Sequence, residues 1–219
     1  MPRMLTSAPT QFGTGITLYG DFLDLDTVHH TIHKIAGEGF HEGHIGNFML
    51  GLAYDLRKAK EKQREVRKLG TEKEDSVNYK GVDVLWPYFL VQVALLRHYA
   101  GYRDTDRKDQ ACLYLLESCA ITSLLAHDPK VGKECAELFL NFPTPPNDYL
   151  FQFFEDRARR FVCTPEKKRF QELPALLRSL WWMSSEYDAF VGKLKDHAEK
   201  QGCSPRELRD KRDWPDFRW

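Results

Sequence analysis

The chain has 219 residues, of which 42% are hydrophobic and 13% aromatic, and its 32 basic residues are balanced by 32 acidic ones. This composition is typical of a packed globular protein and excludes a disordered chain. The zero net charge excludes a global electrostatic attraction to nucleic acid or to an anionic membrane, so binding of either needs a local patch.

The cysteines and the N-terminal residues bear on the compartment. There are five cysteines, an odd number, and none forms a C-x-x-C pair. This usage is typical of buried, reduced thiols in a reducing compartment. The first 13 residues contain no apolar signal-peptide core, and no run approaches the roughly 20 apolar residues of a membrane span. We therefore expect a cytoplasmic protein without membrane association.

The N-terminal part is predicted to begin with a polar, mobile leader over residues 1–14. The β-branched and aromatic segment 15–20 then reads as a short strand that a glycine ends. Apolar residues at spacings of three and four predict a helix over 21–36, with Asp24 or Asp26 as its N-cap.

A long helix is predicted from His44 to about Leu69. Its first half has an apolar stripe, whereas its second half carries almost no apolar residues. A continuous helix of this length would reach about 35 Å, so the charged half would protrude into solvent. The polar segment 70–80 that follows is predicted to be a mobile loop.

The middle of the chain contains its most apolar helix. Residues 82–85 form a second strand-like segment, which we expect to pair with 15–20 in a minor two-stranded β element. Pro87 suits the first turn of a helix over 86–100. Because apolar residues surround this helix on all sides, we predict that it lies at the centre of the fold.

Further helices are predicted after residue 104 from N-cap and proline signals. These start signals are Thr105 or Asp106, Asp128-Pro129, Asn147, Thr164-Pro165, Ser184 or Ser185, and the capping box Ser204–Glu207. Pro174 should kink or interrupt the helix in which it lies. The resulting prediction is a mainly α, single-domain bundle over residues 1–219. It has about eight helices around the central helix 86–100, and a C-terminal tail over 203–219.

Five of the eight histidines fall within sixteen residues of one another. His29 and His33 lie one helical turn apart on one face, a spacing found in zinc sites. His41 and His44 could fold back and complete a tetrahedral shell. The pattern is not H-E-x-x-H and has no cysteine ligand, so it is a weak metal motif, and the alternative is a structural or pH-sensing role. We predict no cofactor, with zinc or another divalent metal at these four histidines as the alternative.

The charged half of the predicted long helix offers a second candidate site. Arg57, Lys60, Arg64 and Arg67 follow a three-four-three spacing and would share one helix face. Such a face could follow a phosphate backbone or bind an acidic protein partner. The alternative is an ordinary solvated surface, supported by pairs such as Arg57 with Glu61.

The last six residues carry three aromatic side chains, Trp214, Phe217 and Trp219. We predict that they dock, either onto the same domain or onto a partner or second copy, where they would act as binding anchors. The aromatic residues around 149–161, together with Trp181 and Trp182, are expected to belong to the core instead.

Several catalytic signatures do not occur in the sequence. They include the phosphate-binding P-loop, the nucleophile elbow and the glycine fingerprint of dinucleotide-binding folds. Gly13-Thr14-Gly15 precedes a predicted strand, which is the wrong order for dinucleotide binding. These absences favour a protein that is not an enzyme, without deciding the question.

Short segments spread over most of the chain carry a family resemblance. They are Gly13–Ile16, Gly20-Asp21, Ile32-His33, Leu85–Pro87, Phe89–Val93 and Leu95–Arg97. In these segments the sequence resembles a bacterial family of small, mostly helical proteins of unknown function. The resemblance implies a prokaryotic cytoplasmic setting and implies no activity.

Two functions from different classes therefore remain. The first is a non-catalytic interaction or accessory protein of a bacterial cytoplasmic system, related to defence or stress. It would bind a protein partner or a second copy through the aromatic tail and the charged helix. The second is a nucleic-acid-binding or metal-dependent hydrolytic protein that uses the His29–His44 cluster and the Arg57–Lys68 helix.

Overall fold

The computed structural model describes residues 4–37, 44–61, 66–69, 77–143, 149–181, 184–208 and 213–219. Over these ranges the protein is mainly α, with eight α-helices and one four-stranded sheet. The helices are α1 (Phe22–Ala36), α2 (His44–Lys60), α3 (Trp86–Ala100), α4 (Arg107–His127), α5 (Pro129–Leu140), α6 (Leu150–Cys163), α7 (Glu166–Ser179) and α8 (Ser185–Gln201).

The sheet is antiparallel throughout, and two of its strands lie at the predicted positions. Its order is β1-β2-β4-β3, formed by β1 (Thr6–Pro9), β2 (Gly15–Gly20), β4 (Val77–Leu85) and β3 (Val66–Leu69). The predicted pairing of 15–20 with 82–85 is confirmed, with Leu18 opposite Val82. Strand β1 lies inside the segment that was predicted to be a mobile leader. The β element is therefore larger than the two strands that the sequence indicated.

The helix prediction that ran to Leu69 is wrong in its second half. Helix α2 ends at Lys60, and residues 66–69 form β3, which pairs with residues 77–80 at the start of β4. The end of the predicted loop 70–80 is therefore strand. Helices gain most of their stability by packing an apolar face, and this charged segment has no such face to pack. Pairing with β4 satisfies its backbone instead.

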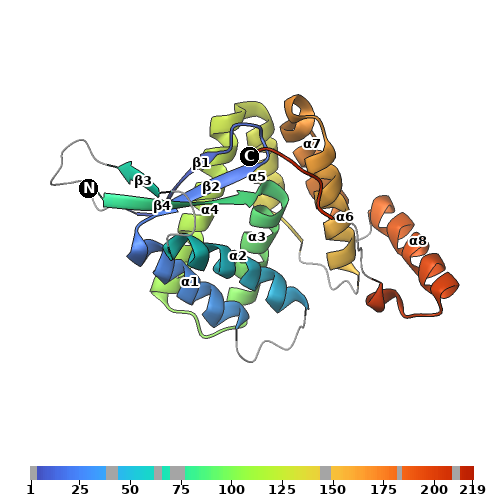
Figure 1. The fold of residues 1–219 in the computed structure, drawn as a ribbon. Helices are drawn as coiled ribbons and strands as arrows, with labels where there is room; N and C mark the ends of the chain where they lie inside the picture. The colour runs from blue at the N-terminus through green and yellow to red at the C-terminus, as the bar shows by residue number, and fades with distance from the viewer. Residues whose placement is uncertain are drawn as a thin grey trace.

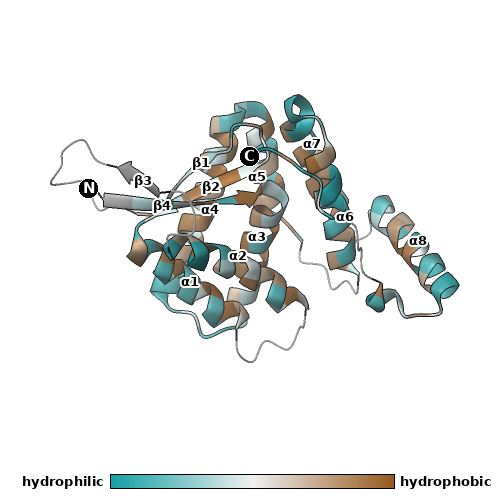
Figure 2. Cartoon of the chain, viewed as in Figure 1, coloured by the Kyte–Doolittle hydropathy of each residue, from teal (hydrophilic) through white to brown (hydrophobic). Residues whose placement is uncertain are grey.

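Helix α3 is central, as predicted. Eleven of its fifteen residues are buried, among them Trp86 and Leu96, which are both fully buried. It contacts α1, α2, α4, α5 and α7 as well as β2 and β4. Figure 1 shows these elements gathered around α3, with α8 at the far end of the molecule from β3. Figure 2 shows the hydrophobic colouring concentrated where the helices face one another.

Most predicted helix starts are correct, and the predicted caps are confirmed at Asp106, Asp128, Ser184 and Ser204. Ser204 precedes the short 3-10 helix η1 (Pro205–Glu207). The cap of α1 is a correction, because Asp21 is the N-cap and Asp24 completes its capping box as the third helical residue. Pro174 lies inside α7 without ending it. Among the described helices, none has the length and apolar character needed to cross a membrane.

Candidate functional site

The histidine cluster is partly described. His29 and His33 lie on α1 with their ring centroids 4.5 Å apart, so the predicted shared face is present. His41 and the side chain of His44 lie outside the described residues. Within the described part of the chain, His, Cys, Asp and Glu side chains form no group of three or more that could hold a metal ion. The metal site remains a prediction.

An ion pair between α1 and α2 lies near the two histidines. Lys60 at the end of α2 forms a 2.7 Å ion pair with Asp26 on α1, and Asp26 also lies 3.4 Å from His30. Burial, followed by the nearby His33 and Lys60, lowers the pKa of His29. This environment keeps His29 neutral and at the same time makes it less attractive to a cation.

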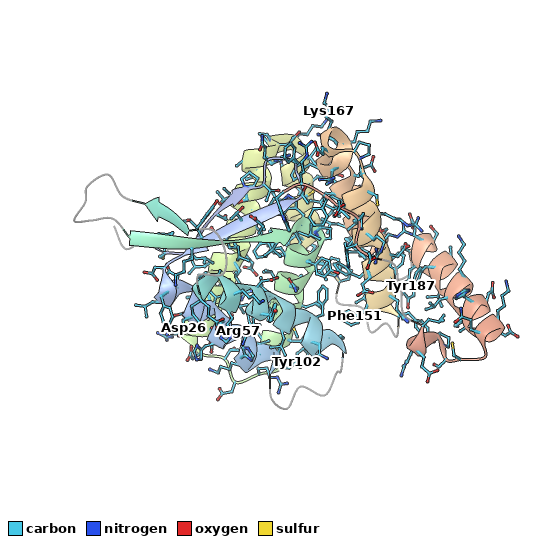
Figure 3. All side chains as sticks on the ribbon, viewed as in Figure 1. Asp26, Arg57, Tyr102, Phe151, Lys167 and Tyr187 are labelled. Carbon is cyan, nitrogen blue, oxygen red and sulfur yellow. The ribbon has the colours of Figure 1, made fainter. Side chains whose placement is uncertain are left out.

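The helix predicted to carry the basic face ends at Lys60. Arg57 lies on α2, where its guanidinium stacks 5.3 Å from the Tyr54 ring centroid, and Figure 3 labels it together with Asp26. Lys60 is occupied by its ion pair with Asp26. Arg64 lies outside the described residues, and Arg67 belongs to β3 rather than to a helix. Binding of nucleic acid or of an acidic partner here stays a prediction, but without the helical face on which it rested.

The aromatic tail lies against its own domain. Trp214 packs near Tyr88 of α3, with ring centroids 6.1 Å apart, and under the guanidinium of Arg159 at 5.0 Å. Phe217 packs against the core. Trp214 and Trp219 are still 39% and 38% exposed. Docking on the same domain is therefore observed, while partner binding by these residues stays a prediction.

A surface cleft lies where the C-terminal half of α3 meets α4 and the end of α5. Its volume is about 390 Å³, which is in the range of sites that hold a side chain or a small ligand. Apolar side chains from α5 and the following residues make up much of the wall. The lining residues are Ala94, Arg97, His98, Glu117, Phe139, Leu140, Phe142 and Pro143.

The polar wall of the cleft is a closed ion pair. Nε and Nη2 of Arg97 donate to the two carboxylate oxygens of Glu117 at 2.6 and 2.9 Å, and Nη1 donates to Gln110 at 2.8 Å. The guanidinium also stacks 4.4 Å from the ring centroid of Tyr114. Such bidentate, charge-assisted bonds hold a planar group in one orientation. The pair therefore gives the cleft a rigid wall with little net charge.

Three exposed side chains either line this cleft or contact a residue that lines it. Tyr102 is 73% exposed, Tyr114 65% and Leu140 56%. The ring of Tyr102 lies 5.3 Å from that of His98, which itself lines the cleft, and Tyr102 projects from the edge of the molecule in Figure 3. We call the residues that line the cleft, together with Tyr102 and Tyr114, the aromatic cleft. Its two tyrosines and its arginine are residue types that are enriched in protein-binding hot spots.

Sequence reasoning did not find the aromatic cleft. Its residues come from three helices, and no local motif joins them. One signal was available in α4, where Tyr114 lies between the inward-facing Leu113 and Leu116 and therefore off the apolar stripe. One such residue is common on protein surfaces, and only its proximity to other exposed apolar side chains in the fold marks a binding surface.

The family comparison extends over nearly the whole chain. A family model described as a domain of unknown function (DUF6904) matches residues 5–219, and the chain belongs to this family. Comparisons with curated proteins and with solved structures gave no match. Family membership thus agrees with the resemblance to a family of unknown function and assigns no activity.

Proposed function

Because family membership assigns no activity, we propose from the geometry of the aromatic cleft that the protein is a non-catalytic interaction protein. The observation that carries this proposal is a cleft of about 390 Å³ edged by Tyr102, Tyr114 and Leu140, all of them more than half exposed. Burying such side chains against a partner removes apolar surface from water at about 25 cal/mol per Å². The cleft would receive an apolar side chain of a protein partner.

The chemistry of the cleft favours binding over catalysis. Both carboxylate oxygens of Glu117 accept bonds from Arg97, so this carboxylate is poorly placed to take a proton from a substrate. Two side chains of the aromatic tail, Trp214 and Trp219, also support an interaction role, because each of them is partly exposed to solvent. A partner that covers the aromatic cleft or the tail would bury anchors that are already held in place.

We also propose a setting for this role, as an accessory component of a bacterial cytoplasmic system related to defence or stress. The support is the resemblance of the sequence segments described above and the state of the cysteines, because the five cysteines of the chain are all free thiols. Free thiols are typical of reducing compartments. The cytoplasmic setting is tested by fractionating cells of the native host. Recovery of the protein in another compartment would contradict it.

The interaction role can be tested by substituting Leu140, which is 56% exposed and lines the cleft. The tagged full chain and a Leu140→Glu variant are expressed in the native host, and co-purifying proteins are quantified by mass spectrometry. A charge in the apolar wall should reduce capture of the partner at least about tenfold, which corresponds to about 1.4 kcal/mol.

The matched control is Leu23→Glu, since Leu23 is 70% exposed and lies at the start of α1, away from the cleft. Capture by this variant should equal that of the unmodified chain. Equal capture by the Leu140→Glu protein, with folding unchanged by circular dichroism, would remove the cleft from the proposal.

A further inference from the structure

A buried arginine in α7 has neutral hydrogen-bond partners. Arg169 is 4% exposed. Its Nη1 donates to Oγ1 of Thr14, and its Nη2 donates to the carbonyl oxygen of Val162 at 2.9 Å. Its Nε has no hydrogen-bond partner. Within the described residues, no carboxylate bonds to this guanidinium.

An arrangement of this kind is unusual in proteins. Arginine is almost never fully buried unless an acidic group pairs with it, because desolvation of the cation is unfavourable. A buried N–H without an acceptor adds a further unfavourable contribution. The end of α6 lies beside Arg169 through Val162, and its partial negative charge compensates only part of the cation. The site therefore has an excess of donors and of positive charge.

The C-terminal residues 213–219, which we call the C-terminal strap, close this site. Oγ1 of Thr14 donates to the carbonyl oxygen of Arg218 at 2.6 Å, and Nη1 of Arg169 lies 3.5 Å from the same oxygen. Figure 1 shows the strap running back along α6 and α7 to the turn before β2. A single backbone oxygen, which carries only a partial charge, thus occupies the position toward which these donors point.

The acidic group nearest to the strap is already engaged. Both oxygens of Glu166 accept from the guanidinium of Arg218, at 2.8 Å each. The Arg218 guanidinium also stacks 4.3 Å from the ring centroid of Phe12. Arg218 therefore holds this carboxylate away from Arg169 while its own carbonyl caps the site.

We propose that Thr14 and Arg169 form an oxyanion-binding site, and that the carbonyl oxygen of Arg218 occupies it in the absence of ligand. The ligand class is a carboxylate or a phosphate group, because either offers a charged oxygen to both Oγ1 of Thr14 and Nη1 of Arg169 in place of the neutral carbonyl. Binding would displace the Arg218 carbonyl and loosen the strap. This site is separate from the aromatic cleft and does not rest on the proposed function.

The test measures the melting temperature of the full chain in sodium phosphate, sodium acetate and sodium chloride at equal ionic strength. We expect a saturable rise in Tm of about 3–6 °C at a tenfold excess of phosphate or acetate over its Kd, relative to chloride. A rise in Tm that does not saturate as the phosphate concentration increases is a general salt effect. The same rise is measured in the site variants described below and is subtracted from that of the unmodified chain. A rise in phosphate alone assigns the site to phosphate, and a rise in both assigns it to carboxylates as well.

Three variants of the site and the strap, together with one control variant, decide the outcome. Arg169→Met should abolish the saturable rise, whereas Arg160→Met, an exposed arginine that pairs with Asp156 on α6, should keep it. Thr14→Val should weaken binding about fivefold, since it removes one hydrogen bond, and it serves if the Arg169 variant does not fold. Phe217→Ser should loosen the strap and raise the apparent affinity. An equal saturable rise in the Arg169→Met or Thr14→Val protein overturns the proposal, as does the lack of one in both the unmodified and Phe217→Ser chains.

Discussion

Gly15 lies where β2 comes closest to β4. A Cβ atom built on this residue would lie 2.1 Å from the carbonyl oxygen of Val84 and 2.9 Å from its carbonyl carbon, and neither is a flexible group. Gly192 in α8 is the opposite case, because a Cβ there would meet nothing within 4 Å. The two glycines therefore make a matched pair for substitution.

Gly15→Ala should lower the free energy of unfolding by at least about 2 kcal/mol, because the paired strands must separate to admit the methyl group. Gly192→Ala should raise it by about 0.5–1 kcal/mol, since alanine is the better helix former. Urea denaturation of both variants checks the pair. A Gly15→Ala protein as stable as the unmodified chain would mean that β2 and β4 are less closely apposed than described.

His127 is a second residue whose surroundings predict a measurable effect. Its ring lies 4.3 Å from that of Phe170, and burial lowers its pKa below the ordinary value of 6.5. The neighbouring carboxylate of Asp128 opposes this shift. As the pH falls through 6.5, the unfolded chain takes up a proton at His127 before the folded chain does, so stability must fall.

His127→Gln should reduce the loss of stability between about pH 7.5 and about pH 5.5, measured by urea denaturation at both values. His197→Gln, at an exposed position in α8, should leave that loss unchanged. If the two variants behave alike, His127 does not contribute to the pH dependence.

At the scale of elements, one carboxylate joins two helices. Asp109 in α4 is 6% exposed and accepts hydrogen bonds from Thr31 at 2.9 Å and from Lys34 at 2.6 Å, both on α1. It also accepts from the backbone N–H of Asp106, the N-cap of α4, at 3.0 Å. Burial raises the pKa of Asp109, but the bonds from Lys34, Asp106 and Thr31 outweigh burial and lower it.

Asp109→Ala should therefore cost about 2–3 kcal/mol, since it leaves the buried hydroxyl of Thr31 without an acceptor and removes the ion pair with the more exposed Lys34. Asp106→Ala removes the helix cap and an exposed 3.7 Å ion pair with Lys34, and should cost about 1 kcal/mol. Chemical denaturation of the two variants gives the comparison. Equal losses would show that Asp109 acts only through the cap of α4.

The same scale shows what the sequence could predict. Caps such as Asp106 and Asp128 were predictable because the capping residue lies next to the turn that it satisfies. Strand β3 was not, because the charged segment after Lys60 contains good helix formers, and only pairing with β4 makes residues 66–69 a strand. The helix caps follow from residues adjacent in the sequence, whereas strand β3 depends on pairing with β4.

At the scale of the whole molecule, the charges balance. With 32 basic and 32 acidic residues and a pI near 7.1, the protein carries almost no net charge at neutral pH. Molecules without net charge do not repel one another, so solubility at low salt should be lowest near pH 7. The pH of lowest solubility is measured by precipitating the protein with polyethylene glycol at a series of pH values.

Lys195→Glu, on the exposed surface of α8, should move the solubility minimum to lower pH because it makes the net charge more negative. A minimum that stays near pH 7 in this variant would show that a local contact surface, such as the aromatic cleft, controls association instead.

Both candidate sites belong to this scale, which explains why sequence reasoning missed them. The aromatic cleft needs Arg97, Glu117 and Leu140 to meet from three helices. The oxyanion site needs Thr14 to meet Arg169 across 155 positions of the chain. No spacing rule joins such residues, although the sequence did predict that the aromatic tail docks.

The contact between Thr14 and Arg218 also has a consequence during synthesis on the ribosome. The two residues are 204 positions apart. At about 5–20 residues per second, about 10–40 s pass between the synthesis of one and the other. During this interval β2 and β4 can pair and α3 can pack, but Thr14 stays uncovered, and Arg169, made 49 positions before Arg218, stays uncovered over the last part of it. The nascent chain therefore presents these polar groups to solvent, to small anions and to other chains until the strap arrives.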